Sequence, residues 1–316
     1  MSAPQRKITV VGAGFVGMTT AQKCAEKELA SEIVLTDVLD GRAQGIALDL
    51  NQAAAVEGYG SRVVGTADPA HTRGSDLFIV TAGKPRKPGM SRSDLLEVNG
   101  RVMASVAESI RDGSPDATVI VVTNPLDVMT AVMRAKLGFP SKRVMGMAGV
   151  LDSARFSWFI AEHLGVSVAD VDSMVLGAHG DSMVPMPAYC TANGVGLPDL
   201  ARPADIDAMV ERTKHGGAEI VGLLKTGSAY YAPAAAAVAM AKSVLGDERR
   251  LLPSCCLLNG HFGFEGIYMG VPAVLGAHGV EKIVEVPLDA DSRALMQKTA
   301  GAIQADLESL RDAGVL

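Results

Sequence analysis

The chain has 316 residues and a formal net charge of −6; 48% of its residues are hydrophobic and 20% are charged. This composition is typical of a globular enzyme with one large domain or two ordinary ones. The acidic balance, with no basic cluster interleaved with aromatics, argues against a nucleic-acid partner, and no apolar run is long enough to span a bilayer.

A glycine-rich stretch near the N-terminus predicts a dinucleotide site. Residues 8–11 form a short β-branched run, and they lead into the pattern G-x-G-x-x-G, which comprises Gly12, Ala13, Gly14, Phe15, Val16 and Gly17. Residues 19–24 then resemble a helix, so the stretch predicts strand, tight turn and helix start. Gly12 permits the turn, Gly14 lets backbone approach a pyrophosphate, and Gly17 lets the helix pack on the strand.

A carboxylate follows at the expected distance. Residues 31–36 predict a second strand, which ends in Asp37, twenty residues beyond Gly17. A carboxylate there can accept hydrogen bonds from the adenosine ribose and would repel a 2′-phosphate. The pattern favours NAD over NADP; the alternative is a turn with a solvated aspartate.

The rest of the first half alternates strand and helix. This order predicts a Rossmann-type, doubly wound parallel sheet. Further strands are expected at 62–66, 76–80, 117–122 and 143–147, and helices at 41–55, 93–111 and 126–137.

The ends of the buried strands predict one shared crevice. Thr81, Ala82 and Gly83 follow one strand, and Val122, Thr123 and Asn124 close another. Ligands of open parallel sheets lie outside the carboxyl ends of the strands. Asn124 could offer its amide to cofactor or substrate, although an ordinary Asn-Pro turn is the alternative.

A basic loop comes next. Pro85, Pro88 and Gly89 exclude regular structure, and the loop carries four basic residues, Lys84, Arg86, Lys87 and Arg92. Beside the crevice, such a segment suggests a lid that carries positive charge to an anionic substrate, within a substrate loop of residues 83–93. A solvated surface loop is the alternative.

The second half departs from strict alternation and predicts an α+β substrate domain. We place an NAD-binding domain at 1–150 and a catalytic domain at 151–316, packed closely because no linker separates them. Helices are expected at 151–164, 206–224, 234–245 and 291–313, and strands at 171–176, 184–192, 251–258 and 266–275.

Three residues of this half suggest acid–base chemistry. Asp152 and Arg155 lie three positions apart at a predicted helix start, and His179 stands between two glycines. If Asp152 reaches His179, it fixes the ring tautomer and raises the pKa of the ring. His179 can then exchange a hydroxyl proton, Arg155 can hold a carboxylate, and Arg92 can polarise a carbonyl. Together they suit hydride transfer between a nicotinamide and a 2-hydroxy acid; a glycine-flanked loop histidine is the alternative for His179 alone.

A second GAHG string gives an internal comparison. His278 occupies it, but Val280 follows where Asp181 follows the first copy. We interpret His278 as a turn residue.

At this point the chain resembles malate dehydrogenases of the branch most similar to lactate dehydrogenases. The resemblance covers nearly the whole length through the motifs G12AGFVG17, A82GKPRKPGMSRSDLL96, T123NPLD127, L151DSARF156, G177AHGDS182 and G227SAYYAP233. It implies His179 as proton donor and acceptor, Asp152 as its partner, and Arg155 and Arg92 as substrate ligands. It also places Asn99 and Asn124 near cofactor and substrate and Ser228 in the pocket wall.

The resemblance further implies that residue 86 selects the substrate. Lactate-specific relatives are uncharged there, whereas Arg86 would pair with the second carboxylate of malate or oxaloacetate. The implied protein is an NAD-dependent enzyme of the tricarboxylic acid cycle, a homodimer or homotetramer with a small-molecule substrate and no membrane partner.

Three rival readings remain. A lactate or other 2-hydroxy acid dehydrogenase would differ in pyruvate turnover, and a silent NAD-sensing module would lack part of the site. An NAD-dependent glycosidase should need a metal, for which no Cys/His spacing is suitable. The cysteines, Cys24, Cys190, Cys255 and Cys256, are expected to be buried thiols in a reducing compartment, which favours the cytoplasm over a secreted location.

Overall fold

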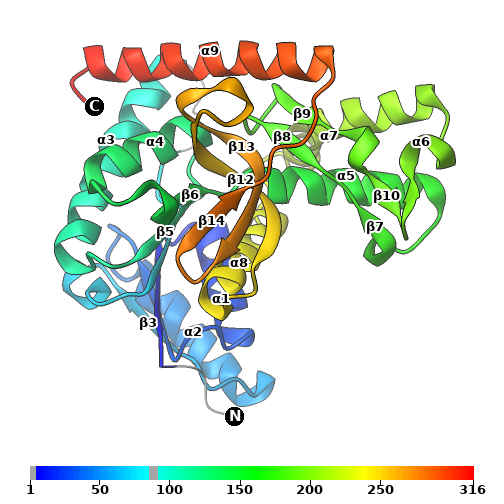
Figure 1. Ribbon diagram of the computed structural model, residues 1–316. Helices are drawn as coiled ribbons and strands as arrows, with labels where there is room; N and C mark the ends of the chain where they lie inside the picture. Colours follow the sequence, from blue (N-terminus) through cyan, green and yellow to red (C-terminus); the bar gives the residue numbers. More distant parts are fainter. Residues whose placement is uncertain (1–4, 85–91) are drawn as a thin grey trace.

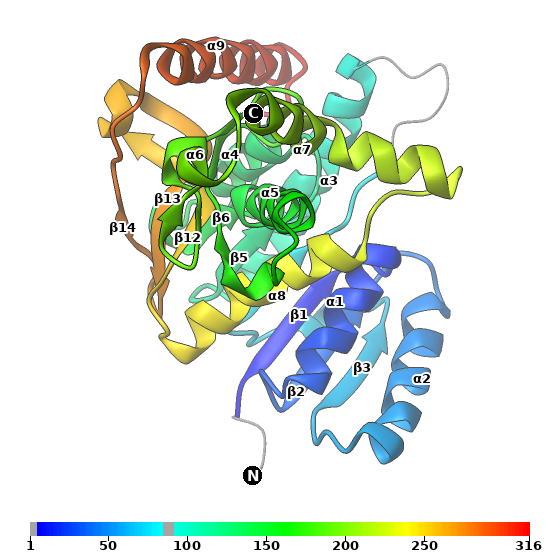
Figure 2. The same cartoon turned by 90° about the vertical axis from the view of Figure 1, so that its right-hand side faces the viewer.

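The structure, a computed structural model, describes residues 5–84 and 92–316 and consists of one large mixed sheet, a small second sheet and covering helices (Figures 1 and 2). Six strands of the first half are parallel in the order β3-β2-β1-β4-β5-β6, so the predicted Rossmann arrangement is confirmed. They are β1 (Lys7–Val11), β2 (Glu32–Thr36), β3 (Arg62–Thr66), β4 (Leu77–Val80), β5 (Thr118–Val121) and β6 (Val144–Gly146).

Helices cover both faces of this parallel part. They are α1 (Phe15–Glu26), α2 (Arg42–Glu57), α3 (Arg92–Gly113) and α4 (Leu126–Leu137). The central strands β4 and β5 are buried along their whole length, as expected for a sheet covered on both faces. Near-continuous apolar runs such as Leu77–Val80 form these strands because no face is left for polar side chains.

The large sheet does not stop at the end of the first half. β12 (Arg250–Asn259) pairs antiparallel with β6 and with β13 (Glu265–Gly276), which pairs in turn with β8 (Val175–Gly177) and β14 (Gly279–Ile283). β9 (Met183–Pro185) closes the order beside β8. The close packing of the two halves is therefore achieved through shared strand pairing, and β14 is a strand that the sequence did not predict.

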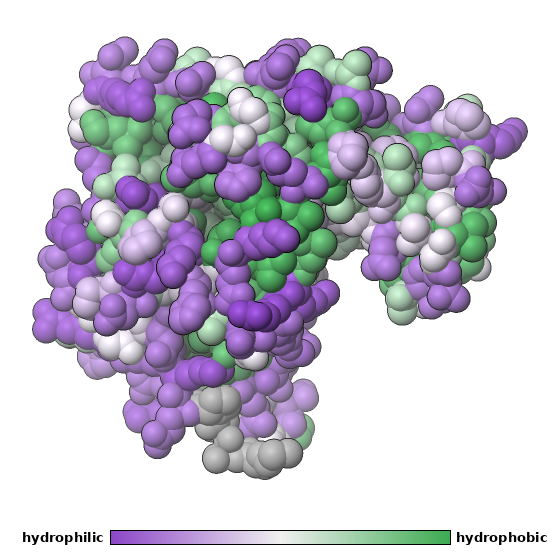
Figure 3. All heavy atoms as spheres, viewed as in Figure 1, coloured by the Kyte–Doolittle hydropathy of each residue, from purple (hydrophilic) through white to green (hydrophobic). Residues whose placement is uncertain are grey.

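A lobe carries the rest of the second half and has its own core. It is formed by α5 (Gly149–Leu164), α6 (Leu197–Leu200), α7 (Pro203–Leu224) and a small sheet of β7 (Val171–Asp172), β10 (Thr191–Ala192) and β11 (Val195–Gly196). Phe156, Ile160 and Met209 belong to its buried cluster. Figure 3 shows this lobe projecting from the body at the right of the view, with hydrophobic residues gathered between it and the rest of the visible face.

Two long helices of the second half pack on the body of the molecule. α8 (Tyr231–Gly246) packs along α1, and α9 (Ala290–Asp312) runs across the top of the molecule in Figure 1 and contacts α3, α4, β8 and β9. Across residues 5–84 and 92–316, each helix is too short or too polar to cross a membrane.

Candidate active site

The turn between β1 and α1 has the geometry that its glycines predict. Gly12 adopts φ +101°, which favours glycine, and a Cβ on Gly17 would collide with the carbonyl oxygen of Gly12. Gly14 is different, because a Cβ there would meet no heavy atom within 4 Å. Gly12 and Gly17 thus serve the fold, while Gly14 leaves open space in front of the helix.

The end of β2 completes this turn. Asp37 accepts hydrogen bonds from the backbone N–H of Ala13, at 2.6 Å, and of Leu39, at 2.9 Å. A cavity of about 650 Å³ adjoins it. The lining comes from the carboxyl ends of several strands and from one face of α3, and includes Gly12, Gly14, Asp37, Leu39, Thr81, Ala82, Gly83, Val102 and Ile110.

These residues fit NAD. Gly14 is the N-cap of α1 and makes no side-chain cap hydrogen bond, so the positive end of the helix faces the open space beside it. The cavity offers apolar walls from Val102 and Ile110 for a base and a carboxylate, Asp37, for ribose hydroxyls. A pyrophosphate at Gly14 would therefore need no rearrangement of the turn.

Polar side chains after β4 and β5 hold the floor of the crevice together. Thr81 Oγ1 donates to the carbonyl of Val11 at 3.0 Å, and Thr123 Oγ1 donates to that of Ala82 at 2.7 Å. Asn99, 2% exposed, uses its amide to accept from Lys84 N–H and to donate to the carbonyl of Asn124, both at 2.8 Å. Asn99 thus ties two strand ends to α3.

The predicted acid–base residues meet at the lobe side of the sheet. His179 Nδ1 lies 2.9 Å from Asp152 Oδ2, and Arg155 Nη1 donates to Asp152 Oδ1 at 3.1 Å. The Asp152 side chain is 2% exposed and that of His179 15%. One buried carboxylate is thereby divided between an imidazole and a guanidinium, while part of the ring still reaches solvent.

The environment of the ring shifts its protonation. Burial lowers the pKa of His179, but the charge of Asp152 and its hydrogen bond raise it, and Asp127 adds to the rise while Arg155 opposes it. The net result is a pKa above that of an ordinary histidine. A larger share of the rings is protonated near neutral pH than burial alone would allow.

The sequence explains how α5 brings Asp152 to this place. The helix begins at Gly149, not at Leu151, and Asp152 lies in its first turn, while the N-cap position is Ala148. Gly149 is close-packed, since a Cβ there would come within 2.6 Å of the Val175 carbonyl oxygen. Ser153 Oγ accepts the Val175 N–H at 3.0 Å, so α5 is fastened directly to β8, the strand that leads to His179.

Two predicted site residues are exposed on the surface, and the side chains of two others are outside the part of the chain that the structure describes. Ser228 is exposed in the segment between α7 and α8, where the contact described for its hydroxyl is with the carbonyl of Ala229. Phe15 is 54% exposed and stacks on Tyr230 at 5.3 Å between ring centroids. Arg86 lies outside the described residues, and Arg92 is the first residue of α3, with its side chain outside the description.

The remaining predicted residues have the following positions in the fold. Asn124 is exposed just beyond β5, and Val122 is half-buried before it. Val16 is in the first turn of α1, and His278 lies in the β13–β14 turn, as expected.

Two features were not found from the sequence. Asp127 lies buried in the first turn of α4 and accepts the His179 N–H at 3.2 Å, which extends the site to the end of β5. Gly216 and Gly217 of α7 face Arg155, whose guanidinium would be 3.5 Å from a Cβ on Gly217. An Asp directly after Asn-Pro-Leu was a visible signal for the first; mid-helix glycines were a weak signal for the second.

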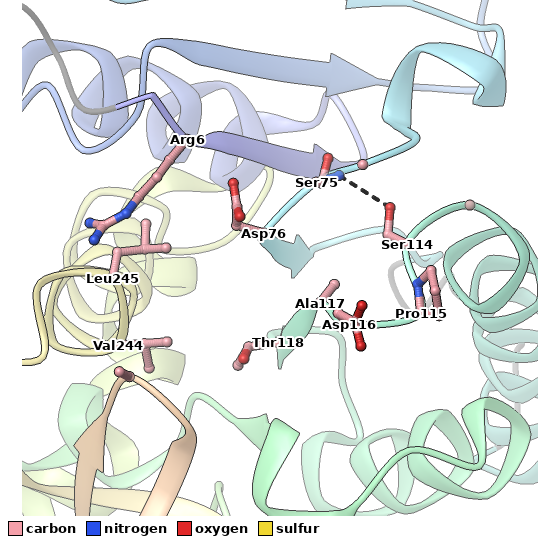
Figure 4. Close-up of a pocket in the computed structure, with 13 residues that line it drawn as sticks. Arg6, Ser75, Asp76, Ser114, Pro115, Asp116, Ala117, Thr118, Val244 and Leu245 are labelled. Carbon is pink, nitrogen blue, oxygen red and sulfur yellow. Dashed lines mark hydrogen bonds between the residues drawn. The ribbon is translucent and has the colours of Figure 1, made fainter.

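A second cavity, of about 440 Å³, opens at the opposite edge of the parallel sheet (Figure 4). Arg6, Asp76 and Asp116 line it, and Ser75 N–H donates to Ser114 Oγ at 3.2 Å across one side. It lies at the amino ends of β1, β4 and β5, and therefore away from the edge that carries the turn, the crevice and His179.

A dinucleotide crevice and a buried Asp–His pair in the same chain are characteristic of nicotinamide-dependent dehydrogenases, in which the protein supplies orientation and proton transfer. Sequence comparison narrows this class. Residues 6–146 match the lactate/malate dehydrogenase NAD binding domain, and residues 149–313 match the alpha/beta C-terminal domain of the same proteins. The chain belongs to the lactate/malate dehydrogenase family, and its cofactor is NAD.

Individual relatives align over nearly the full length. The malate dehydrogenase of Salinibacter ruber is 50% identical over 98% of this chain and 99% of its own, and that of Roseiflexus castenholzii is 49% identical over 96% and 98%. The solved Salinibacter ruber structure superposes with a TM-score of 0.93 at 48% identity, covering 98% and 99% of the two chains. A Cryptosporidium parvum lactate dehydrogenase complexed with lactic acid and NAD also reaches 0.93, at 41% identity, covering 97% and 98%.

Proposed function

We propose that the protein is an NAD-dependent malate dehydrogenase that interconverts (S)-malate and oxaloacetate. The observation that carries the proposal is the His179–Asp152 pair, joined at 2.9 Å, with Arg155 on the other carboxylate oxygen. The relatives named above as malate dehydrogenases, close to 50% identical over nearly the whole chain, support the choice of substrate.

The residues divide the work as follows. NAD, when bound, supplies the hydride acceptor. The Nδ1–H of His179 donates to Asp152, which leaves Nε2 to take the proton of the malate hydroxyl or to return it to oxaloacetate. Asp152 holds the ring in this tautomer and favours its charged form. Arg155 grips the C1 carboxylate, and Arg92 polarises the reacting oxygen.

The other predicted residues position the two ligands. Asn124 and Ser228 complete the substrate pocket. The cofactor is held by the turn and the strand ends, namely Gly12, Ala13, Gly14, Phe15, Val16, Gly17, Asp37, Thr81, Ala82, Gly83, Asn99, Val122, Thr123 and Asn124.

One measurement tests the function. NADH oxidation is followed with oxaloacetate and with pyruvate for the wild type and for His179→Asn. We expect oxaloacetate to be preferred, and the variant to lose about 10²–10⁴-fold in turnover, which is the usual contribution of a positioned acid–base group. Wild-type rates in the variant would remove His179 from the mechanism.

The fold does not distinguish malate from lactate dehydrogenases, because solved structures of both kinds are equally similar to this chain. We therefore assign the choice of substrate to one side chain, that of Arg86. A guanidinium at this position would pair with the second carboxylate of oxaloacetate, and pyruvate has a methyl group there. We expect Arg86→Gln to lower the preference for oxaloacetate over pyruvate by about tenfold to a hundredfold, the worth of a charge-assisted hydrogen bond. Arg86→Lys, which keeps the charge, is the control; unchanged selectivity in Arg86→Gln would refute the assignment.

The wider assignments follow the same family relation. We propose an NAD-binding domain at 1–150 and a catalytic domain at 151–316, a cytoplasmic enzyme of the tricarboxylic acid cycle, and a homodimer or homotetramer. The four cysteines, all buried free thiols, support a reducing compartment. Exposed apolar side chains on helices, among them Leu48, Val56 and Leu223, support self-association, which light scattering on a size-exclusion column would test.

A further inference from the structure

Asp127 is a second carboxylate beside the acid–base histidine. It lies in the first turn of α4, is 4% exposed, and its Oδ2 accepts the backbone N–H of His179 at 3.2 Å. Its Oδ1 is also buried, and the Cys255 thiol, a weak donor, lies beside the carboxylate. One oxygen therefore anchors the His179 loop, and the other is kept from water with at most a weak hydrogen bond.

The groups that face Asp127 come from two other elements. His179 approaches from the loop after β8, and the Cys255 thiol approaches from β12. Burial raises the pKa of Asp127 to about 6, although the Cys255 thiol and the His179 charge each lower it. The pKa of Cys255 itself is raised well above its usual value, so the thiol keeps its proton and can donate it in a hydrogen bond.

Strand register fixes this arrangement. Cys255 pairs with Gly146 of β6 on one side and with Gly270 of β13 on the other, and Gly270 pairs with Gly177 of β8. A single row across four strands thus connects the end of the parallel sheet, through Cys255, to the residue two positions before His179. The backbones of β13 and β8 leave no room for a side chain in this row, since a Cβ on Gly270 would lie 2.5 Å from the Gly177 carbonyl oxygen.

We propose that Asp127 is a positioning residue for His179, which anchors the histidine backbone and whose negative charge, supported by the Cys255 thiol, adds to that of Asp152 in favouring the imidazolium. This inference rests on the proposed role of His179. A backbone acceptor alone would need no charge, and a neutral amide could accept the same N–H without the cost of burying a carboxylate. The negative charge of Asp127 acts on the His179 ring, since it raises the pKa of that ring.

The test measures the pKa of His179 in two independent ways. The imidazole C–H resonances of the unliganded enzyme are titrated by NMR, with the His179 signal identified by its loss in His179→Asn. The pH dependence of kcat/KM is then measured for oxaloacetate reduction. In Asp127→Asn, which keeps an acceptor oxygen, we expect the His179 pKa to fall by about 0.5 to 1 unit and the alkaline limb of kcat/KM to move with it. A shift of this size gives about a three- to tenfold loss of rate above the limb.

Adjacent cysteines supply a matched control. Cys255→Ala removes the thiol donor, so Asp127 should ionise less readily. The alkaline limb of kcat/KM should then move to lower pH, as in Asp127→Asn, and Cys255→Ser, which keeps a donor, should return it to the wild-type position. Cys256→Ala removes an equally buried thiol one residue along the strand, and should leave the limb in place.

Two results overturn the inference: an unmoved His179 pKa in Asp127→Asn, or a loss of rate that is equal at all pH values, as a purely structural role would give. If Asp127→Asn does not fold, the Cys255 variants decide in the same way. The NMR titration needs no turnover, so a wild type inactive with oxaloacetate would refute the proposed function while the inference about Asp127 is still judged.

Discussion

At the scale of single residues, the site depends on how one buried carboxylate is shared. Asp152 contacts His179 through Oδ2 and Arg155 through Oδ1, so each oxygen has a cationic or potentially cationic partner. Burial is the largest single influence on the ring and lowers its pKa, but the charge and the hydrogen bond of Asp152, together with the charge of Asp127, outweigh it and raise the pKa of His179. The direction of the His179 shift thus depends mainly on Asp152.

This gives a prediction for Asp152→Asn. The amide can still accept a hydrogen bond, but its charge is gone, so burial then dominates and the pKa of His179 falls. Oxaloacetate reduction, which needs the protonated ring, should lose its rate at lower pH than in the wild type. We expect kcat/KM at neutral pH to fall by about 10²–10⁴-fold, measured by NADH oxidation across a pH series. An alkaline limb that stays in place would contradict the electrostatic role of Asp152.

At the scale of elements, the start of α1 separates folding from binding within one motif. Gly17 is needed because the helix touches the Gly12 carbonyl, whereas Gly14, with φ −73° and ψ −177°, has an ordinary backbone and open space around it. Two glycines three positions apart therefore serve different purposes: Gly17 allows the helix to pack, and Gly14 leaves room for a ligand.

Substitution by alanine should expose this difference. Gly17→Ala should lower the free energy of unfolding by about 1 to 3 kcal/mol, because the added methyl group meets backbone that cannot move aside. Gly14→Ala should change it by less than about 1 kcal/mol, since its conformation suits alanine. Thermal unfolding without cofactor checks both values.

The affinity for NADH should also distinguish the roles of the two glycines. NADH titration followed by fluorescence should show at least tenfold weaker binding in Gly14→Ala, because the methyl group would fill the space assigned to the pyrophosphate. Wild-type NADH affinity in Gly14→Ala would show that the pyrophosphate lies elsewhere.

At the scale of the whole molecule, one sheet unites the cofactor crevice with the acid–base pair. The parallel strands carry the turn and Asp37, and the antiparallel extension through β12, β13 and β8 carries His179. α5 then crosses to the same place, held on β8 by Ser153. The site depends on pairing between strands more than 100 residues apart, such as Gly146 with Cys255.

The buried carboxylate of Asp127 should lower the free energy of unfolding at neutral pH. Burial raises the pKa of Asp127 in the folded protein to about 6, above its ordinary value of 3.8, so ionisation disfavours the folded state. The penalty is absent below the unfolded pKa and grows as the pH rises to the folded value, and two pKa units correspond to about 3 kcal/mol.

Asp127→Asn removes this titration. The difference in unfolding free energy between variant and wild type should therefore move in favour of the variant by up to about 3 kcal/mol between pH 4 and pH 7. Denaturant titrations at each pH measure it, and any constant effect of the amide cancels from the trend. A difference independent of pH would mean that Asp127 is not ionised at a cost in the folded protein.

The sequence by itself determined the local elements and the residue types of the site. Period, turn glycines and apolar runs predicted the Rossmann strands, the turn at Gly12 and the helix that carries Asp152, because these depend on neighbours a few positions away. Asp152, Arg155 and His179 could be chosen because their chemistry suits one reaction.

Only the tertiary structure decided how these pieces meet. The joining of β6 to β12 and the contact of Asp127 with the His179 loop depend on the register between segments far apart in the sequence, which carries no short-range signal. Asp127 looked like an ordinary first-turn acid of a helix, and Cys255 like core packing. The two residues come together because a row of small residues lets β6, β12, β13 and β8 pair closely side by side. This proximity arises only when the chain is folded.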